Sequence, residues 1–200
     1  MSRLYVCLTV LAVILASGQG ILAVHENLGC SDCHIIHGQR SNATSGQNDP
    51  IWNPAQMADG LPTFTLYSSQ TFDALNTDIT QPDGASRLCL GCHDGSYSDL
   101  NTRDGGRLKF GPADLARMHP ISFTYDTALA SRSVGLKDPN QTMSGLGGTI
   151  SRDLLDGRNK VQCSSCHDMH STGKGRAMLR YDYNPATGSD VIFCRTCHNR

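Results

Sequence analysis

Apolar residues gather at the start of the chain and are sparse afterwards. An apolar run covers residues 4–15, with one positive charge before it at Arg3 and small, flexible residues after it up to Ala23. This order is typical of a secretory signal peptide, and the run is shorter than the roughly 20 residues that cross a membrane as a helix. We therefore expect cleavage after Ala23, with residues 24–200 forming one exported domain without a transmembrane span.

Beyond the signal peptide the chain is polar. After residue 24, Leu, Ile, Val and Phe are sparse, whereas Gly, Ser, Thr, Asn and Asp are abundant. The pattern predicts two brief helices, at residues 70–75 and at residues 111–118, and a turn at residues 82–84. So little apolar surface gives a poor conventional core, and we expect a mostly irregular fold with a few short helices.

Four short motifs carry the chemistry of the chain. Two cysteines separated by two residues are followed at once by a histidine at Cys30–His34, Cys89–His93, Cys163–His167 and Cys194–His198, called the first to fourth motifs below. Such cysteine pairs alone also occur in zinc sites and in thioredoxin-like redox sites. With 8 histidines in 200 residues, however, a histidine after every pair is not accidental. The pattern indicates c-type haem, held by two thioether bonds and a proximal histidine.

The cysteine count agrees with four haem c groups. Nine cysteines less Cys7, inside the signal peptide, leave eight, and four haems use them all: Cys30, Cys33, Cys89, Cys92, Cys163, Cys166, Cys194 and Cys197. No thiol remains for the disulfides that commonly stabilise exported proteins. We therefore expect a haem-cored fold.

The motifs also indicate an internal duplication. Each half begins with C-S-x-C-H-x-x-H and ends with a plain C-x-x-C-H. This order predicts two modules of two haems each, at about residues 24–110 and 111–200.

The remaining histidines supply a second ligand for each iron. Besides the proximal His34, His93, His167 and His198, the chain contains His25, His37, His119 and His170. An iron with two histidine ligands is a low-potential electron-transfer centre, whereas a methionine ligand raises the potential. Met118 and Met169 each lie beside a spare histidine, so we interpret them as packing residues.

His37 and His170 each follow a proximal histidine by three residues. Side chains at this spacing leave a helical turn from the same face, whereas two axial ligands approach opposite faces of a porphyrin. Each should therefore bind the iron of another haem, and for His170 we expect the haem of His198. His37 or His25, on a short N-terminal segment, could bind a haem of a neighbouring subunit, and such head-to-tail contacts give open filaments.

Residues 25–200 resemble, over nearly their whole length, the multihaem c-type cytochromes with doubled CXXCH motifs. The size and N-terminal module resemble the outer-surface tetrahaem cytochromes of the OmcE type. The resemblance rests on the segments YSSQTFDALN, QPDGASRLCLGCHDG, MHPISFTYD, VQCSSCHDMHS and CRTCHN. It implies a subunit of an extracellular filament with a continuous haem chain, in which one haem takes its second histidine from a neighbouring subunit. It also implies distal positions for His37, His119 and His170.

Two classes of function compete. Electron conduction, as a filament subunit or a soluble periplasmic carrier, uses six-coordinate irons, whereas a reductase of small nitrogen oxides needs a vacant iron position. The chain has no variant motif, few lysines and enough histidines for every iron. We therefore expect an electron-transfer protein and not an enzyme.

Charge adds a little about partners. The formal net charge is −1 and becomes −2 once Arg3 is removed, before the acidic haem propionates are counted. No basic face appears, which disfavours nucleic-acid binding. Redox partner proteins or extracellular metal acceptors are the expected partners, outside the cell, at its surface or in the periplasm.

Overall fold

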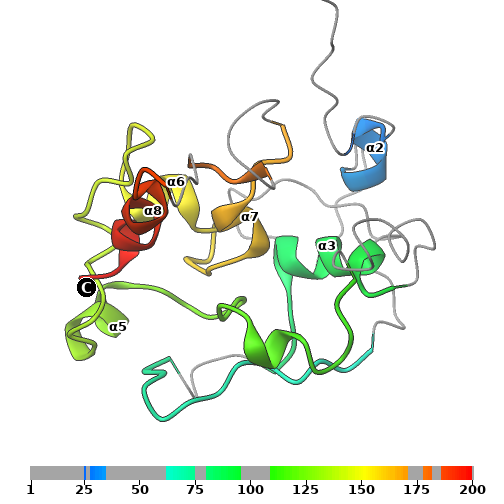
Figure 1. Cartoon of the computed structure of the whole chain (residues 1–200), viewed down its shortest axis with the longest axis horizontal. Helices are drawn as coiled ribbons and strands as arrows, with labels where there is room; N and C mark the ends of the chain where they lie inside the picture. Colours follow the sequence, from blue (N-terminus) through cyan, green and yellow to red (C-terminus); the bar gives the residue numbers. More distant parts are fainter. Residues whose placement is uncertain are drawn as a thin grey trace, which may run out of the picture.

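The computed structural model describes residues 25, 28–34, 62–74, 80–95, 109–170, 178–181 and 186–199. In this part of the chain the fold is mostly irregular, as expected, with short helices and no strand (Figure 1). The elements in chain order are α2 (Cys30–Cys33), α3 (Gly84–His93), the 3-10 helix η2 (Leu115–Arg117), α5 (Thr127–Arg132), α6 (Ile150–Leu154), α7 (Cys163–Cys166) and α8 (Ser189–Cys197).

The predicted local elements are confirmed only in part. Within the described residues 70–74 the chain forms turns and no helix, because Phe72 packs edge-on against Phe123, with ring centres 5.4 Å apart. Residues 111–118 form a turn followed by η2. The predicted turn at residues 82–84 is instead the start of α3, where Asp83 is the N-cap residue and Gly84 has a φ of 49°.

Two helices that the sequence pattern did not predict are held by side-chain caps. The Asp126 carboxylate accepts a hydrogen bond from the N–H of Leu129 at the start of α5, and the Thr149 hydroxyl accepts one from Arg152 at the start of α6. Each bond satisfies a backbone donor that the first helical turn leaves open. Both helices are short, and each buries its leucine or isoleucine residues against the core.

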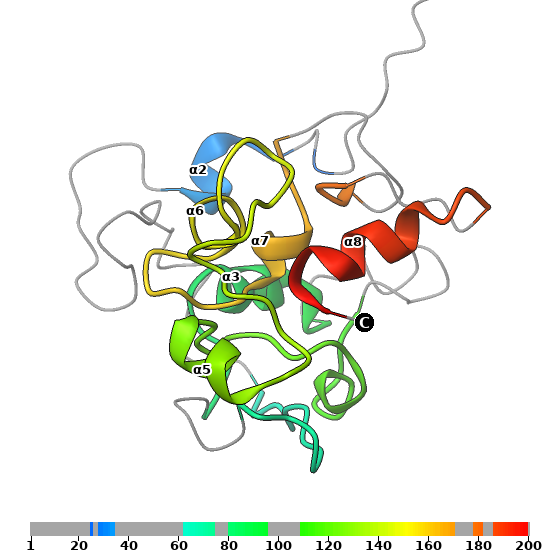
Figure 2. The ribbon, with the colours of Figure 1, turned by 90° about the vertical axis from the view of Figure 1, so that its left-hand side faces the viewer.

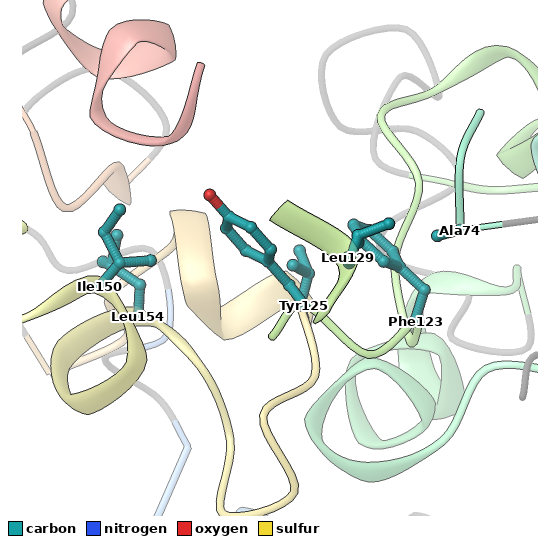
Figure 3. Packing of buried hydrophobic residues seen from close by; sticks show 7 residues of the cluster. Ala74, Phe123, Tyr125, Leu129, Ile150 and Leu154 are labelled. Carbon is teal, nitrogen blue, oxygen red and sulfur yellow. The ribbon is translucent and has the colours of Figure 1, made fainter. Parts of the chain in front are cut away.

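The described residues contain two apolar clusters. The larger consists of Ala74, Phe123, Tyr125, Leu129, Ile150, Leu154 and Val161 (Figure 3), and the smaller of Phe64, Leu90 and Leu115. The larger cluster joins α5 and α6 to the extended segment before α5. The sequence predicts only a poor core, because these apolar residues are scattered singly along a polar chain.

Isolated backbone pairings take the place of a sheet in the described part of the chain. Antiparallel bridges join Thr124 to Lys160, Leu136 to His198, Met143 to Thr149, and His167 to Leu179. Two of these four bridges involve the histidine of a motif. The pairings therefore anchor the third and fourth motifs to segments elsewhere in the chain.

No helix in the described residues has the length and apolar character that a membrane span requires. The predicted signal peptide, residues 1–23, lies outside the described residues.

Candidate functional site

All four cysteine motifs share one local geometry. The two cysteines lie within a helix, which is a single turn in α2 and α7 and the last turn in α3 and α8. Cysteines three residues apart on a helix project from the same face, as two bonds to one flat group require. The helix ends at the histidine or just after it: the N–H groups of His34, His167 and His198 donate to the carbonyl of the first cysteine of their own motifs, over 2.8, 3.0 and 3.1 Å.

Thiols of different motifs also lie close to one another. The side chains of Cys89 and Cys163, from the second and third motifs, are hydrogen-bonded to each other. This interaction is the main cause that raises the pKa of Cys89 and lowers the pKa of Cys163. The thiols of the second and third motifs are therefore neighbours.

The thiols of the first and fourth motifs also have neighbours in the second and third motifs. The thiol of Cys33 interacts electrostatically with that of Cys92. At the other end, burial first and then the charge of Cys163 raise the pKa of Cys166 to about 11, and Cys194 adds to the shift. Burial and the neighbouring Cys166 raise the pKa of Cys197 to about 12. Figure 1 shows α2, α3, α7 and α8 following one another from right to left.

Histidines distant in sequence form three close pairs. The ring centres of His25 and His93 are 6.3 Å apart, those of His34 and His170 are 6.1 Å apart, and those of His119 and His198 are 6.2 Å apart. Each pair combines one proximal candidate with one distal candidate. No described histidine occurs in two of these pairs.

The separation within each pair fits two imidazoles that share one metal ion. An imidazole nitrogen binds a metal ion at about 2 Å, and the ring centre lies about 1 Å behind that nitrogen, so two rings on opposite sides of one ion have centres about 6 Å apart. The distance alone is not specific, since the ring of Phe110 also lies 6.1 Å from that of His93. The combination of one proximal and one distal histidine in all three pairs is what distinguishes them.

We expected His170 to pair with His198, but in the structure it lies beside His34, and the neighbour of His198 is His119. His34 belongs to the first motif, whereas His170 follows the third. His25 lies beside His93 of the same chain. His37 is outside the described residues.

Hydrogen bonds at His119 and near His198 orient these two histidines. The Nδ1 atom of His119 lies 2.9 Å from the carbonyl oxygen of Pro120, so a proton on Nδ1 leaves Nε2 available as a ligand. The carbonyl of Cys197 accepts from the N–H of Lys137 over 2.9 Å and from the hydroxyl of Tyr125 over 3.3 Å. In Figure 3 the Tyr125 hydroxyl points away from the apolar cluster. These bonds fix the backbone that ends at His198.

The third motif is held by the segment at residues 178–180. The N–H of Asp168 donates to Met178 over 2.7 Å, and the N–H of Arg180 donates to Cys166 over 2.9 Å. The Arg180 side chain donates in addition to the carbonyl of Ser164 over 2.7 Å. The residues before and after His167 are therefore both hydrogen-bonded to this segment.

The sequence did not indicate a polar group that consists of the buried residues Ser86, Ser122 and Gln162 and the partly exposed Asp83. Serine, aspartate and glutamine are common in this chain, so composition gives no signal for them. Their only local hint is the helix-capping position of Asp83 and Gln162.

Clusters of three or more histidine, cysteine, aspartate or glutamate side chains suited to a metal ion do not occur among the described residues. The arrangement present there is pairwise, with two imidazoles in each pair. No protein-family model and no curated protein matches this chain. Its chemistry is therefore argued from the residues and their geometry.

Proposed function

We propose that the protein transfers electrons through four covalently bound c-type haems, each with two histidine ligands. The observation that carries this proposal is the set of three histidine pairs at 6.1–6.3 Å, each joining the histidine of a CXXCH motif to a histidine from elsewhere in the chain. The spacing leaves room for one metal ion between two imidazoles.

The cysteines fit the same group. Each helical turn presents two thiols on one face, and attachment adds each thiol across a vinyl group, with the sulfur bonding one carbon and the proton going to the other. When bound, haem supplies an iron centre that gains and loses one electron at low potential. The chain then contributes the covalent attachment, the two axial imidazoles and the small apolar clusters beside them.

Three of the four proposed irons have both ligands within the described residues. His93 and His25 would hold the second-motif iron, His34 and His170 the first, and His198 and His119 the fourth. His167 is the proximal ligand of the remaining motif. We propose His37 as its second ligand, since it is the distal candidate outside the three pairs.

The contacts between thiols support a continuous path for electrons. The thiols of Cys33 and Cys92, of Cys89 and Cys163, and of Cys166 with Cys194 and Cys197 interact electrostatically. The four attachment sites therefore follow one another in sequence order, and electrons would pass between neighbouring motifs.

We further propose that copies of this chain join head to tail as an extracellular filament. His25 and His37 were the two candidates for an iron bond between subunits, and the position of His25 beside His93 leaves His37 for that role. A bond from His37 to the third-motif iron of a neighbour would combine subunit contact and electron path. The alternative is a soluble periplasmic carrier in which His37 binds within its own chain.

A reductase of small nitrogen oxides is disfavoured by the same pairs. Such an enzyme needs an iron with a vacant position, whereas paired imidazoles occupy both faces. The test is the spectrum of the purified ferric protein with and without nitrite, and of the reduced protein with and without carbon monoxide. Four low-spin irons that bind neither ligand are expected, and a high-spin iron that binds nitrite would contradict the proposal.

A further inference from the structure

A buried polar cluster joins the helices of the second and third motifs. We call its members, Asp83, Ser86, Ser122 and Gln162, the junction. Ser86, Ser122 and Gln162 are 0, 1 and 1% exposed. The helices that it joins, α3 and α7, lie side by side in Figures 1 and 2. Ser86 lies three residues before Cys89, and Gln162 directly precedes Cys163.

The side-chain amide of Gln162 uses its full hydrogen-bonding capacity. Its Nε2 donates to Asp83 Oδ1 over 2.9 Å and to Asp156 Oδ2 over 2.8 Å. Its Oε1 accepts from the hydroxyls of Ser86 and Ser122 over 2.5 and 3.1 Å. A side-chain amide has two donor hydrogens and two acceptor lone pairs, so this group is completely satisfied. A buried amide of this kind fixes the relative position of everything that it bonds.

The two serine hydroxyls that donate to this amide also accept hydrogen bonds from the backbone. The N–H of Cys163 donates to the Ser86 hydroxyl over 2.9 Å, which ties the start of α7 to α3. The N–H of Asp83 donates to the Ser122 hydroxyl over 3.1 Å. Ser122 has a φ of 63°, a strained conformation for a non-glycine residue that persists only where neighbouring contacts impose it.

Two cations balance the partly buried carboxylate of Asp83. Lys160 Nζ donates to Asp83 Oδ2 over 3.0 Å, and Arg158 Nη2 lies 3.1 Å from the same oxygen. Lys160 is itself only 8% exposed. The junction is therefore a compensated network, in which removing one member leaves several buried groups without their partners.

We propose that Gln162 and Ser86 are positioning residues that set the electron-transfer contact between the second- and third-motif haems. The inference depends on the proposed function. Their bonds hold the start of α7, at Cys163, against α3, the helix that carries Cys89. This contact also links the two predicted modules. The junction therefore controls the transfer of electrons from one pair of haems to the other.

The test compares the holoprotein with the Ser86→Ala and Gln162→Met variants. Each variant keeps most of the side-chain volume and removes junction hydrogen bonds. Ser131→Ala is the matched control, because it removes the hydroxyl that donates to Thr127 over 2.7 Å in the exposed helix α5. Haem number is measured by intact mass, and electron exchange between haems by the haem-methyl proton resonances of partly reduced protein.

We expect four haems in every variant, with exchange between the first two and the last two haems slowed several-fold in Ser86→Ala and Gln162→Met. Exchange within each half should stay at its original rate, and Ser131→Ala should behave like the original protein. Unchanged exchange across the junction in Ser86→Ala, or equal slowing at all steps, would overturn the inference and leave the proposed function intact. A parent protein without covalent haem would overturn both.

Discussion

His34 and His170 lie with their ring centres 6.1 Å apart and their planes only 18° from parallel. His34 belongs to the first motif and His170 follows the third by three residues, so the histidine that follows one motif lies beside the histidine of another. Close spacing of two histidines in the sequence thus connects two separate motifs in space.

Replacing His170 by alanine should leave four haems attached and make the first-motif iron five-coordinate and high-spin. The reason is that His34 loses the imidazole opposite it, whereas the thioether bonds are untouched. Assigned haem resonances and the high-spin signal of the ferric protein give the measurement. Met169→Leu, at the adjacent exposed position, is the control. A change confined to the fourth-motif haem would show that the pairing with His34 is wrong.

The angles between ring planes predict different magnetic signatures for two haems. The planes of His34 and His170 are 18° apart, whereas those of His119 and His198 are 76° apart. Near-parallel imidazoles donate into the same iron d orbital and split the d levels, while near-perpendicular imidazoles leave them close in energy. We expect a rhombic low-spin resonance from the first-motif iron and a highly anisotropic one from the fourth.

His119→Ala should therefore abolish a highly anisotropic resonance and leave the rhombic signal of the first-motif iron in place. Electron paramagnetic resonance of the ferric protein at low temperature provides the measurement. Loss of the rhombic signal instead would mean that the two orientations are assigned to the wrong motifs.

His37→Ala tests assembly. If His37 binds the third-motif iron of a neighbouring subunit, the variant should carry four haems but remain monomeric, with one five-coordinate iron. Electron microscopy and the ferric spectrum report the two effects separately. His25→Ala is the comparison, and it should affect the second-motif iron because His25 lies beside His93. Filaments of His37→Ala with all irons six-coordinate would contradict the proposed bond.

Asp153 should make the stability of the fold sensitive to acid. Hydrogen bonds from the Ser144 hydroxyl, from Arg152 and from the N–H of Gly148 hold the pKa of Asp153 below its ordinary value, against a smaller effect of burial. A carboxyl with a lowered pKa in the folded state contributes stability that is complete above its unfolded pKa of 3.8. That contribution is lost as the pH falls through the lower, folded pKa.

The melting temperature of the original protein should therefore drop between about pH 5 and about pH 2 by more than that of Asp153→Asn, which has no carboxylate to protonate. Thermal unfolding followed by circular dichroism over this range gives the comparison. Equal slopes for the two proteins would show that Asp153 does not contribute.

Some of this architecture was predictable from the chain and some was not. Covalent attachment requires a fixed local spacing, so the four cysteine pairs and the histidines after them are visible in the sequence. The equal numbers of motif histidines and further histidines also indicated His25, His119 and His170 as candidate second ligands of the proposed irons. The neighbours of these histidines depend on how distant segments fold together, so the sequence did not indicate that His170 lies beside His34.

Local pattern failed most clearly where long-range packing or buried polar groups decide the structure. Residues 70–74 favour a helix in isolation, but Phe72 is needed against Phe123, and the segment forms turns. Gln162 and Ser86 look like ordinary surface residues in a polar chain, yet both are buried. Three of the four hydrogen bonds of the Gln162 amide join it to residues at least 40 positions away, and no sequence spacing encodes those.

The central claim, four covalent haems in one chain, is tested most directly by the intact mass of the exported protein under denaturing conditions. The account predicts the mass of residues 24–200 plus four haem groups, with all eight motif cysteines resistant to thiol alkylation. A mass with fewer than four haems, or with free thiols at any of the four motifs, would contradict it.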